Sequence, residues 1–192
     1  MGDKEKIVMV GDYSTGKTCM LIRLTQRFFN SEHNPTIGAA FVRHTITLSN
    51  GQRKDISLWD TSGDERFRSV MPVYFRGASC AIIVFDVTNR ESFNSLQYWI
   101  NLAKDSGNAD MNIVIAGTKC DLEKHVTEEE AMEFGREVGY PVIFCSAYNG
   151  ENIENVFKKA AESSRTPIKP DDDSIIDPVK PGPNEGGNSG CC

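Results

Sequence analysis

The stretch GDYSTGKT, from Gly11 to Thr18, decides the fold of this chain. It matches the pattern G-x-x-x-x-G-K-[ST], it follows the apolar run Ile7 to Val10, and a helical pattern opens at Lys17. Glycines allow a sharp turn after a buried strand, so that backbone N–H groups point at a common centre beside a helix N-terminus. The context therefore predicts a phosphate-binding loop rather than a glycine-containing turn that matches by chance.

The side chains of this loop fit a nucleotide that is bound together with Mg²⁺. Lys17 can reach the β- and γ-phosphates as a point charge, and the Thr18 hydroxyl can take one position on the cation, which prefers oxygen ligands. We expect the rest of the loop to contact the nucleotide as well: Gly11, Tyr13, Ser14, Thr15, Gly16 and Cys19.

Length and composition limit the remaining possibilities. The chain has 192 residues, 39% of them hydrophobic, which is enough for one α/β domain that we place at residues 1–165. The net charge of −6 disfavours nucleic acid as a partner and gives no long-range attraction to an anionic membrane. We expect synthesis in the cytosol, because no signal peptide opens the chain and no stretch approaches the ~20 apolar residues of a membrane-spanning helix.

The 6 cysteines fall into two groups. Four lie in apolar or helical segments without metal-ligand spacing, and we expect them to be small buried hydrophobes in a reducing compartment: Cys19, Cys80, Cys120 and Cys145. Cys191 and Cys192 are adjacent and terminal. They close residues 166–192, which are rich in Pro, Gly, Asp, Asn and Ser and are predicted to be a disordered tail, because no periodic apolar residues offset the entropy of ordering.

Strand and helix patterns alternate between the loop and the tail. Four continuous apolar runs predict parallel strands buried on both faces: Ile7 to Val10, Ala81 to Phe85, Ile113 to Ala116 and Val142 to Cys145. Apolar and polar residues alternate in two segments on either side of Asn50-Gly51, which predicts an antiparallel hairpin at the edge of the sheet: Phe41 to Leu48 and Asp55 to Trp59. Apolar residues recur at helical spacing in four segments, which follow Lys17, Glu91, Glu128 and Glu151. Thr127 and Glu130 form a capping box that marks the start of the third of these helices. These patterns predict a single doubly wound, mostly parallel α/β sheet.

In doubly wound sheets the ligand lies beyond the carboxyl ends of the strands. Asp60-Thr61-Ser62-Gly63 follows one strand, and there the Asp60 carboxylate is expected to hold Mg²⁺ and the Gly63 N–H to meet the γ-phosphate. Thr118-Lys119-Cys120-Asp121 follows another, and the Asp121 carboxylate can accept from N1–H and the exocyclic amine of guanine but not from adenine. Either tetrapeptide alone is more often a turn or a helix cap. The three motifs in this order predict a guanine-nucleotide site.

With these motifs the chain resembles the Ras superfamily of small GTPases, and specifically the Rab family, over Glu5 to Glu162. Trp59-Asp60-Thr61 is similar to the start of the second switch, RFRSVMPVYFRGA from Arg66 to Ala78 is typical of Rabs, and Ile37-Gly38-Ala39-Ala40-Phe41 is similar to the early-endosomal branch. The resemblance implies the phosphate-loop NTPase fold of small GTPases and a GTP/GDP-dependent switch in vesicle-mediated membrane traffic, with an endocytic role.

The resemblance also implies the roles of individual site residues. Thr36 would bind the γ-phosphate through its N–H, the alternative being a turn residue after Pro35, and Phe29 would stack on guanine unless it belongs to the core. The ligands of Mg²⁺ would be Thr18, Thr36 and Asp60. The catalytic residues would be Asp64, Gly63 and Thr36. Further contacts to the nucleotide would come from Thr118, Lys119, Ser146 and Ala147.

Two loops, residues 29–40 and 61–76, would change conformation with the nucleotide in such a switch. Aromatic residues at their edges would bind effectors in the GTP state, pack the hairpin onto the domain, or do both: Phe41, Trp59, Phe67 and Tyr74. The family further implies a monomer that meets an exchange factor, a GTPase-activating protein, an escort protein and a dissociation inhibitor. Geranylgeranyl groups on Cys191 and Cys192 would attach it to the cytoplasmic face of an endosomal or other vesicle membrane, and it would cycle with the cytosol.

The chain departs from the Rab pattern near the expected nucleotide. Asp64 stands where most Rabs carry the Gln that orients the attacking water, and Tyr13 stands where relatives carry Gly or Ser. Both changes predict slow hydrolysis that depends on an activating protein. Three further departures are Thr118 for Asn, His33 for an aromatic residue and Tyr148 for Lys. A GTP-bound scaffold with negligible hydrolysis is the alternative, and a phosphate-loop kinase is disfavoured by the guanine and switch motifs.

Overall fold

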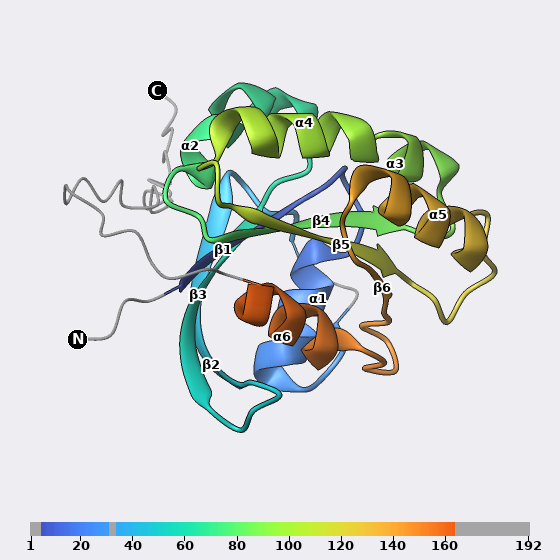
Figure 1. Cartoon of the computed structure of the whole chain (residues 1–192). Coiled ribbons are helices and arrows are strands. Elements are labelled where there is room, and N and C mark those ends of the chain that lie inside the picture. The colour runs from blue at the N-terminus through green and yellow to red at the C-terminus, as the bar shows by residue number, and fades with distance from the viewer. Residues whose placement is uncertain (1–4, 31–33, 164–192) are drawn as a thin grey trace, which may run out of the picture.

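The computed structural model describes residues 5–30 and 34–163, in which a six-stranded sheet carries helices on both faces (Figure 1). The strand order is β2-β3-β1-β4-β5-β6. The strands are β1 (Glu5–Val10), β2 (Ala39–Thr47), β3 (Arg53–Thr61), β4 (Cys80–Asp86), β5 (Asn112–Thr118) and β6 (Val142–Phe144). β2 runs antiparallel to β3, and the other neighbouring strands pair in parallel. The predicted doubly wound sheet with one antiparallel edge is therefore confirmed.

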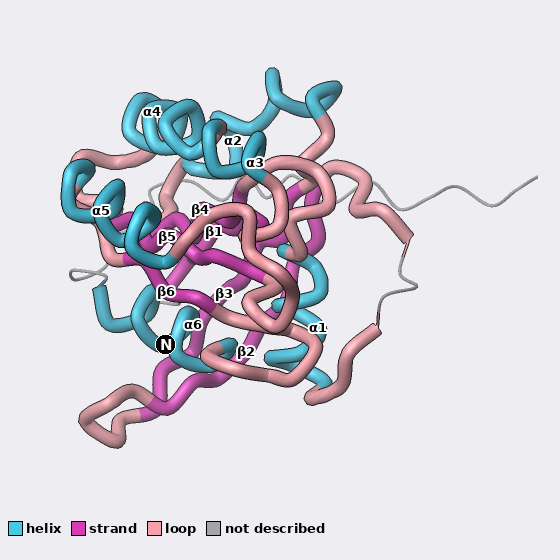
Figure 2. The backbone as a smooth tube through the Cα atoms, turned by 90° about the vertical axis from the view of Figure 1, so that its right-hand side faces the viewer, coloured by secondary structure: helices cyan, strands magenta, loops and turns pink. Residues whose placement is uncertain are grey.

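The helices form two layers, one on each face of the sheet. On one face lie α1 (Lys17–Gln26) and α6 (Ile153–Ser163). On the other face lie α2 (Met71–Phe75), α3 (Arg90–Asn94), α4 (Leu96–Ser106) and α5 (Glu128–Val138). Figure 2 shows the strands in magenta between these two layers. Because both faces are covered, every residue of the central strand β4 is buried, which explains the unbroken apolar run from Cys80 to Phe85.

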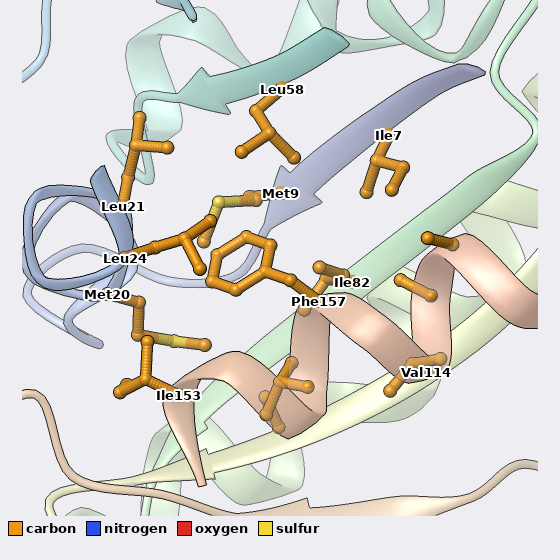
Figure 3. Close-up of a cluster of buried hydrophobic side chains, with 14 of the residues drawn as sticks. Ile7, Met9, Met20, Leu21, Leu24, Leu58, Ile82, Val114, Ile153 and Phe157 are labelled. Carbon is orange, nitrogen blue, oxygen red and sulfur yellow. The ribbon is translucent and has the colours of Figure 1, made fainter. Parts of the chain in front are cut away.

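The core beneath α1 and α6 fixes the helix that follows the phosphate loop. The ring of Phe157, on α6, is fully buried and lies among side chains of α1 and the central strands, such as Leu24 and Met9 (Figure 3). Complete burial of one such side chain stabilises the fold by roughly 1.5–3 kcal/mol. This packing holds the start of α1 in a constant position relative to the end of β1, and the loop between them is thereby held at both ends.

Two helical regions differ from the sequence prediction. Residues 65–75 form a 3-10 helix, η1 (Glu65–Val70), followed by α2, where the sequence pattern predicts no helix. Each is too short to display a helical period. The single helix predicted after Glu91 is divided into α3 and α4 at Ser95, whose hydroxyl donates to the Glu91 carbonyl oxygen at 3.1 Å. Such a bond from a serine to the preceding turn bends helices.

The cysteines and one helix cap test other predictions. The capping box is confirmed, because the Thr127 hydroxyl accepts from the Glu130 N–H at 3.2 Å. Cys80 and Cys145 are buried, as predicted. The prediction is wrong for Cys19, in the first turn of α1, and for Cys120, which follows β5, because both are half-buried. Within residues 5–30 and 34–163, no helix combines the length and the apolar character needed to cross a bilayer.

The β2–β3 hairpin is joined to the last turn of α6. The Ser49 N–H donates to Glu162 Oε1 at 2.6 Å, and Lys54 Nζ donates to the Ala161 carbonyl oxygen at 2.8 Å. Lys54 also forms an ion pair with the buried Glu5 at 2.5 Å. The hairpin, the start of β1 and the end of α6 thus form one connected corner at the amino end of β1.

Candidate functional site

The predicted phosphate loop connects β1 to α1 and closes around a lysine. Lys17 Nζ donates to the carbonyl oxygens of Gly11 and Asp12 at 2.8 and 2.7 Å. Burial lowers the pKa of Lys17 to about 8, although Asp60 and Asp12 act in the opposite direction. A buried ammonium whose hydrogen bonds go to backbone carbonyls is suited to bind an anion, because phosphate oxygens would add negative charge directly at the ammonium.

Three oxygen-bearing side chains from three separate segments meet beside this lysine. Thr18 Oγ1 lies 2.7 Å from Asp60 Oδ2, Thr36 Oγ1 lies 3.1 Å from the same oxygen, and the two hydroxyls lie 2.9 Å apart. The contact with Asp60 means that Thr36 is more than a turn residue after Pro35. One carboxylate and two hydroxyls form the donor set that hard cations such as Mg²⁺ prefer.

A cation at this oxygen cluster could take its remaining ligands from a bound nucleotide and from water. In residues 5–30 and 34–163, no group of three or more His, Cys, Asp or Glu side chains could hold a metal ion. Mg²⁺ typically binds through one or two carboxylates, substrate phosphates and water. The donor set thus fits a cation that arrives with a nucleotide.

The chain packs closely where β3 leads into the second switch. A Cβ atom on Gly63 would lie 2.4 Å from both the carbonyl carbon and the oxygen of Asp12, and 2.5 Å from the Tyr13 nitrogen. Only a glycine fits against the phosphate loop at this distance. The cleft beside it is lined by Tyr13, Ser14, Gly16, Lys17, Thr18, Pro35, Thr36, Thr61, Ser62 and Gly63. Pro35, Thr61 and Ser62 were not among the predicted site residues, although Pro35 and Ser62 directly precede Thr36 and Gly63.

The guanine motif after β5 is connected to the phosphate loop and to the loop after β6. The Thr118 hydroxyl lies 2.6 Å from the Thr15 carbonyl oxygen, which links the two loops. Lys119 forms an ion pair with Asp86 at 2.5 Å. Ser146 Oγ donates to Asp121 Oδ1, also at 2.5 Å. Residues that the sequence separates by more than a hundred positions therefore lie together at the carboxyl edge of the sheet.

The remaining predicted nucleotide contacts lie around this edge. Phe29 is 38% exposed, which excludes the alternative that it is a core residue, and its ring contacts Tyr148. Cys19, in the first turn of α1, donates through Sγ to the Asn30 carbonyl oxygen at 3.8 Å. Ala147 packs against the hydrophobic core beneath α1 and α6.

Asp64, one of the expected catalytic residues, pairs with a neighbouring arginine. Its carboxylate accepts from the Arg66 N–H at 2.9 Å and from Arg66 Nε and Nη2 at 3.0 and 2.6 Å. Hydrogen bonds from Arg66 lower the pKa of Asp64. Asp64 thus caps η1 and pairs with an arginine, and it is absent from the lining of the cleft.

The expected effector aromatics form a continuous row across β2, β3 and α2. Ring centroids lie 5.2 Å apart for Phe41 and Trp59 and 6.1 Å apart for Trp59 and Tyr74. Phe41 is 39% exposed, so packing of the hairpin and exposure to a partner coexist in this row. Phe67, the fourth predicted member, is half-buried in η1.

Two aspartates of the site were not among the predicted residues. Asp12 supplies a carbonyl oxygen to Lys17, and its carboxylate accepts from Trp99 Nε1 at 2.8 Å, which ties the phosphate loop to α4. Asp86 pairs with Lys119. Both residues lie at the carboxyl ends of strands, so the rule that singled out Asp60 could have found them. His33, Cys191 and Cys192, together with residues 166–192, lie outside the described residues.

Comparisons with known proteins agree with this geometry. A sequence model of the Ras family matches residues 6–166. The chain is 43% identical over 158 residues to the Ras-related protein Rab-5B of Plasmodium falciparum (isolate 3D7), covering 82% of this chain and 76% of the relative. It is 36% identical over 187 residues to the Ras-related protein Rab-31 of Mus musculus, covering 96% and 88%. Human Rab-31 is 38% identical over 155 residues, covering 80% and 79%.

Proposed function

The chain belongs to the Ras family and is a Rab small GTPase that acts in membrane traffic, and from this premise we propose that it is a slowly hydrolysing GTP/GDP switch of the endocytic branch. The observation that carries the proposal is the contact of Thr18, Thr36 and Asp60, because it joins the phosphate loop, the first switch and the second switch at one point. A γ-phosphate with its cation would stabilise that arrangement, and loss of the phosphate would release both switches.

The nucleotide phosphates would lie in the cradle around Lys17. The ammonium would donate to β- and γ-phosphate oxygens in place of a backbone carbonyl, with further contacts from the loop residues Gly11, Tyr13, Ser14, Thr15, Gly16 and Cys19. Thr18, Thr36 and Asp60 would hold Mg²⁺, which when bound neutralises charge that develops on the phosphates. Thr36 and Gly63 would donate their backbone N–H groups to the γ-phosphate.

Guanine selection would depend on Asp121. Its carboxylate accepts a hydrogen bond from the Ser146 hydroxyl at 2.5 Å, which would restrict the rotation of the group. Accepting from N1–H and the exocyclic amine would distinguish guanine from adenine, since adenine presents an acceptor at N1. Thr118 would act structurally through its bond to the phosphate loop, and Lys119 and Ala147 would flank the base.

The surroundings of Asp64 support the proposal of slow hydrolysis. Its carboxylate is occupied by Arg66 on two of its sides and has a lowered pKa, so it is a weak base for water. It also lacks the amide donor and the reach of glutamine. Tyr13, which lines the cleft, would narrow the space for the attacking water. An activating protein would then have to supply the group that orients the water.

The membrane and partner proposals extend from the same domain. Cys191 and Cys192 would carry geranylgeranyl groups, and the row of Phe41, Trp59 and Tyr74 would bind effectors in the GTP state. The chain would act as a monomer on the cytoplasmic face of an endosomal membrane and would cycle with the cytosol through a dissociation inhibitor. An escort protein, an exchange factor and a GTPase-activating protein would complete the cycle.

Single-turnover hydrolysis of bound GTP tests this proposal. Asp64→Gln should raise the rate by about 10- to 100-fold, because the amide can both donate to and orient the water. Asp64→Asn is the matched control: it removes the charge but adds no reach, so it should give a smaller gain. Tyr13→Ser should add to the effect of Asp64→Gln if both residues face one pocket. A hydrolysis rate that is unchanged or lower in Asp64→Gln would contradict the proposal that Asp64 slows hydrolysis. A wild-type protein that never hydrolyses GTP would favour the alternative of a GTP-bound scaffold.

A further inference from the structure

Two exposed aromatic rings contact each other beside the guanine motif. The ring centroids of Phe29 and Tyr148 lie 5.5 Å apart, and the ring planes meet at 81°, an edge-to-face arrangement that aromatic pairs prefer. Tyr148 is 66% exposed and Phe29 38% exposed. The pair therefore lies at the surface of the site and contributes little to the core.

The two rings come from segments that are far apart in the chain but are fixed to each other. Phe29 follows α1, and Tyr148 lies in the connection between β6 and α6. Arg23, on α1, joins the two segments, because its guanidinium donates to the Arg27 carbonyl oxygen at 3.3 Å and to the Asn149 carbonyl oxygen at 3.0 Å. The backbone on each side of the ring pair is thus held by one arginine.

The loop that carries Tyr148 also orients the guanine-selecting carboxylate. Ser146 donates to Asp121 at 2.5 Å and in turn accepts from the Asn149 N–H at 3.3 Å. The Gly150 N–H donates to the Ser146 carbonyl oxygen at 2.9 Å. Tyr148 lies inside this hydrogen-bonded turn, so its ring starts from a constrained backbone when it reaches across to Phe29.

We propose that Tyr148 is a positioning residue that holds the Phe29 ring over the guanine base and thereby slows nucleotide release. This inference rests on the guanine site proposed above, and it adds a residue that the family pattern does not supply, since Rabs carry Lys at this position. An aromatic pair of this kind contributes enough to change a dissociation rate by about 2- to 10-fold. The nucleotide would leave only when the two rings separate.

Release of tritium-labelled GDP from the purified full-length protein, after addition of excess unlabelled GTP, measures the effect directly. Tyr148→Ala and Tyr148→Lys should each accelerate release by about 2- to 10-fold. Tyr148→Phe should release GDP as slowly as the wild type, because the ring and not the hydroxyl makes the contact. Met132→Ala, at an exposed position on α5 outside the site, is the control that should leave release unchanged. The exposure of Tyr148 means that these variants should fold, which thermal melting can verify.

A double-mutant cycle separates an action through Phe29 from a direct contact with the base. If Tyr148 acts by holding Phe29, Tyr148→Ala should change release by less than about twofold in a Phe29→Ala background. An equal acceleration in both backgrounds, or wild-type release from Tyr148→Ala and Tyr148→Lys, would overturn the proposal while leaving the guanine site intact. Failure of the wild-type protein to bind GDP would instead overturn the guanine site, and the positioning role with it.

Discussion

Substitution of Gly63 by alanine tests whether the contact between the second switch and the phosphate loop governs hydrolysis. The added Cβ atom would lie 2.4 Å from the backbone of Asp12, whereas ordinary van der Waals contact begins at 3.4 Å. The backbone of residue 63 must therefore retreat by about 1 Å, and a misplacement of that size costs on the order of 100-fold in rate. Single-turnover GTP hydrolysis should fall by about that factor, and GDP affinity should change far less because Gly63 would contact only the γ-phosphate.

Gly51→Ala is the matched control for this substitution. Gly51 has a φ of 81°, so alanine is strained there, but nothing lies within 4 Å of the added atom in the hairpin turn. This variant should lose some stability and keep the hydrolysis rate. If Gly63→Ala hydrolyses GTP within about twofold of wild type, the close contact with the phosphate loop does not set the geometry of the reaction.

Three further outcomes are expected. Burial lowers the pKa of Lys17 to about 8, and phosphate favours the charged ammonium, so GDP binding above that pH should be accompanied by uptake of a proton. The affinity for GDP, measured by calorimetry, should therefore fall about tenfold between pH 7 and pH 9, and a constant affinity would contradict this prediction. Asp121→Asn removes a charged acceptor and should weaken GTP binding by about 10- to 100-fold in competition titrations with ATP, whereas equal affinities of the wild type for the two nucleotides would refute guanine selection. A Cys191→Ser, Cys192→Ser double variant should fractionate as a soluble protein, since stable anchoring requires two lipid signals; membrane association equal to wild type would exclude these cysteines as the attachment.

The parts of the fold that the sequence predicts well are those in which a local pattern coincides with burial. β4 and β5 are covered on both faces, so nearly every residue is apolar and the strands can be read directly. Thr18 and Asp60 could be expected to meet because Asp60 lies at the carboxyl end of one parallel strand and Thr18 at the start of the helix that follows another. Residues 65–75 could not be predicted in this way, because a six-residue and a five-residue helix show too little of a period.

Side-chain orientation is the part of the site that the sequence could not provide. The pairing of Asp64 with Arg66 depends on the 3-10 geometry of η1, which brings the guanidinium back onto the cap. The bond between Asp12 and Trp99 joins residues 87 positions apart, and no local rule relates them. Motifs identify which residues meet the ligand, whereas the rotamers decide what each residue is free to do there.

The corner formed by the β2–β3 hairpin, β1 and α6 lies at the opposite end of β1 from the phosphate loop. Lys54 links Ala161, in the last turn of α6, to Glu5 at the amino end of β1, whereas the phosphate loop begins after Val10 at the other end of the same strand. Six residues of strand span roughly 20 Å. The last turn of α6 therefore lies on the side opposite the proposed nucleotide site, and the hydrogen bonds of Ser49 and Lys54 hold it to the β2–β3 hairpin. The fold thus separates the end of α6 from the phosphate loop by about the length of one strand, so the two can contact different surfaces at the same time.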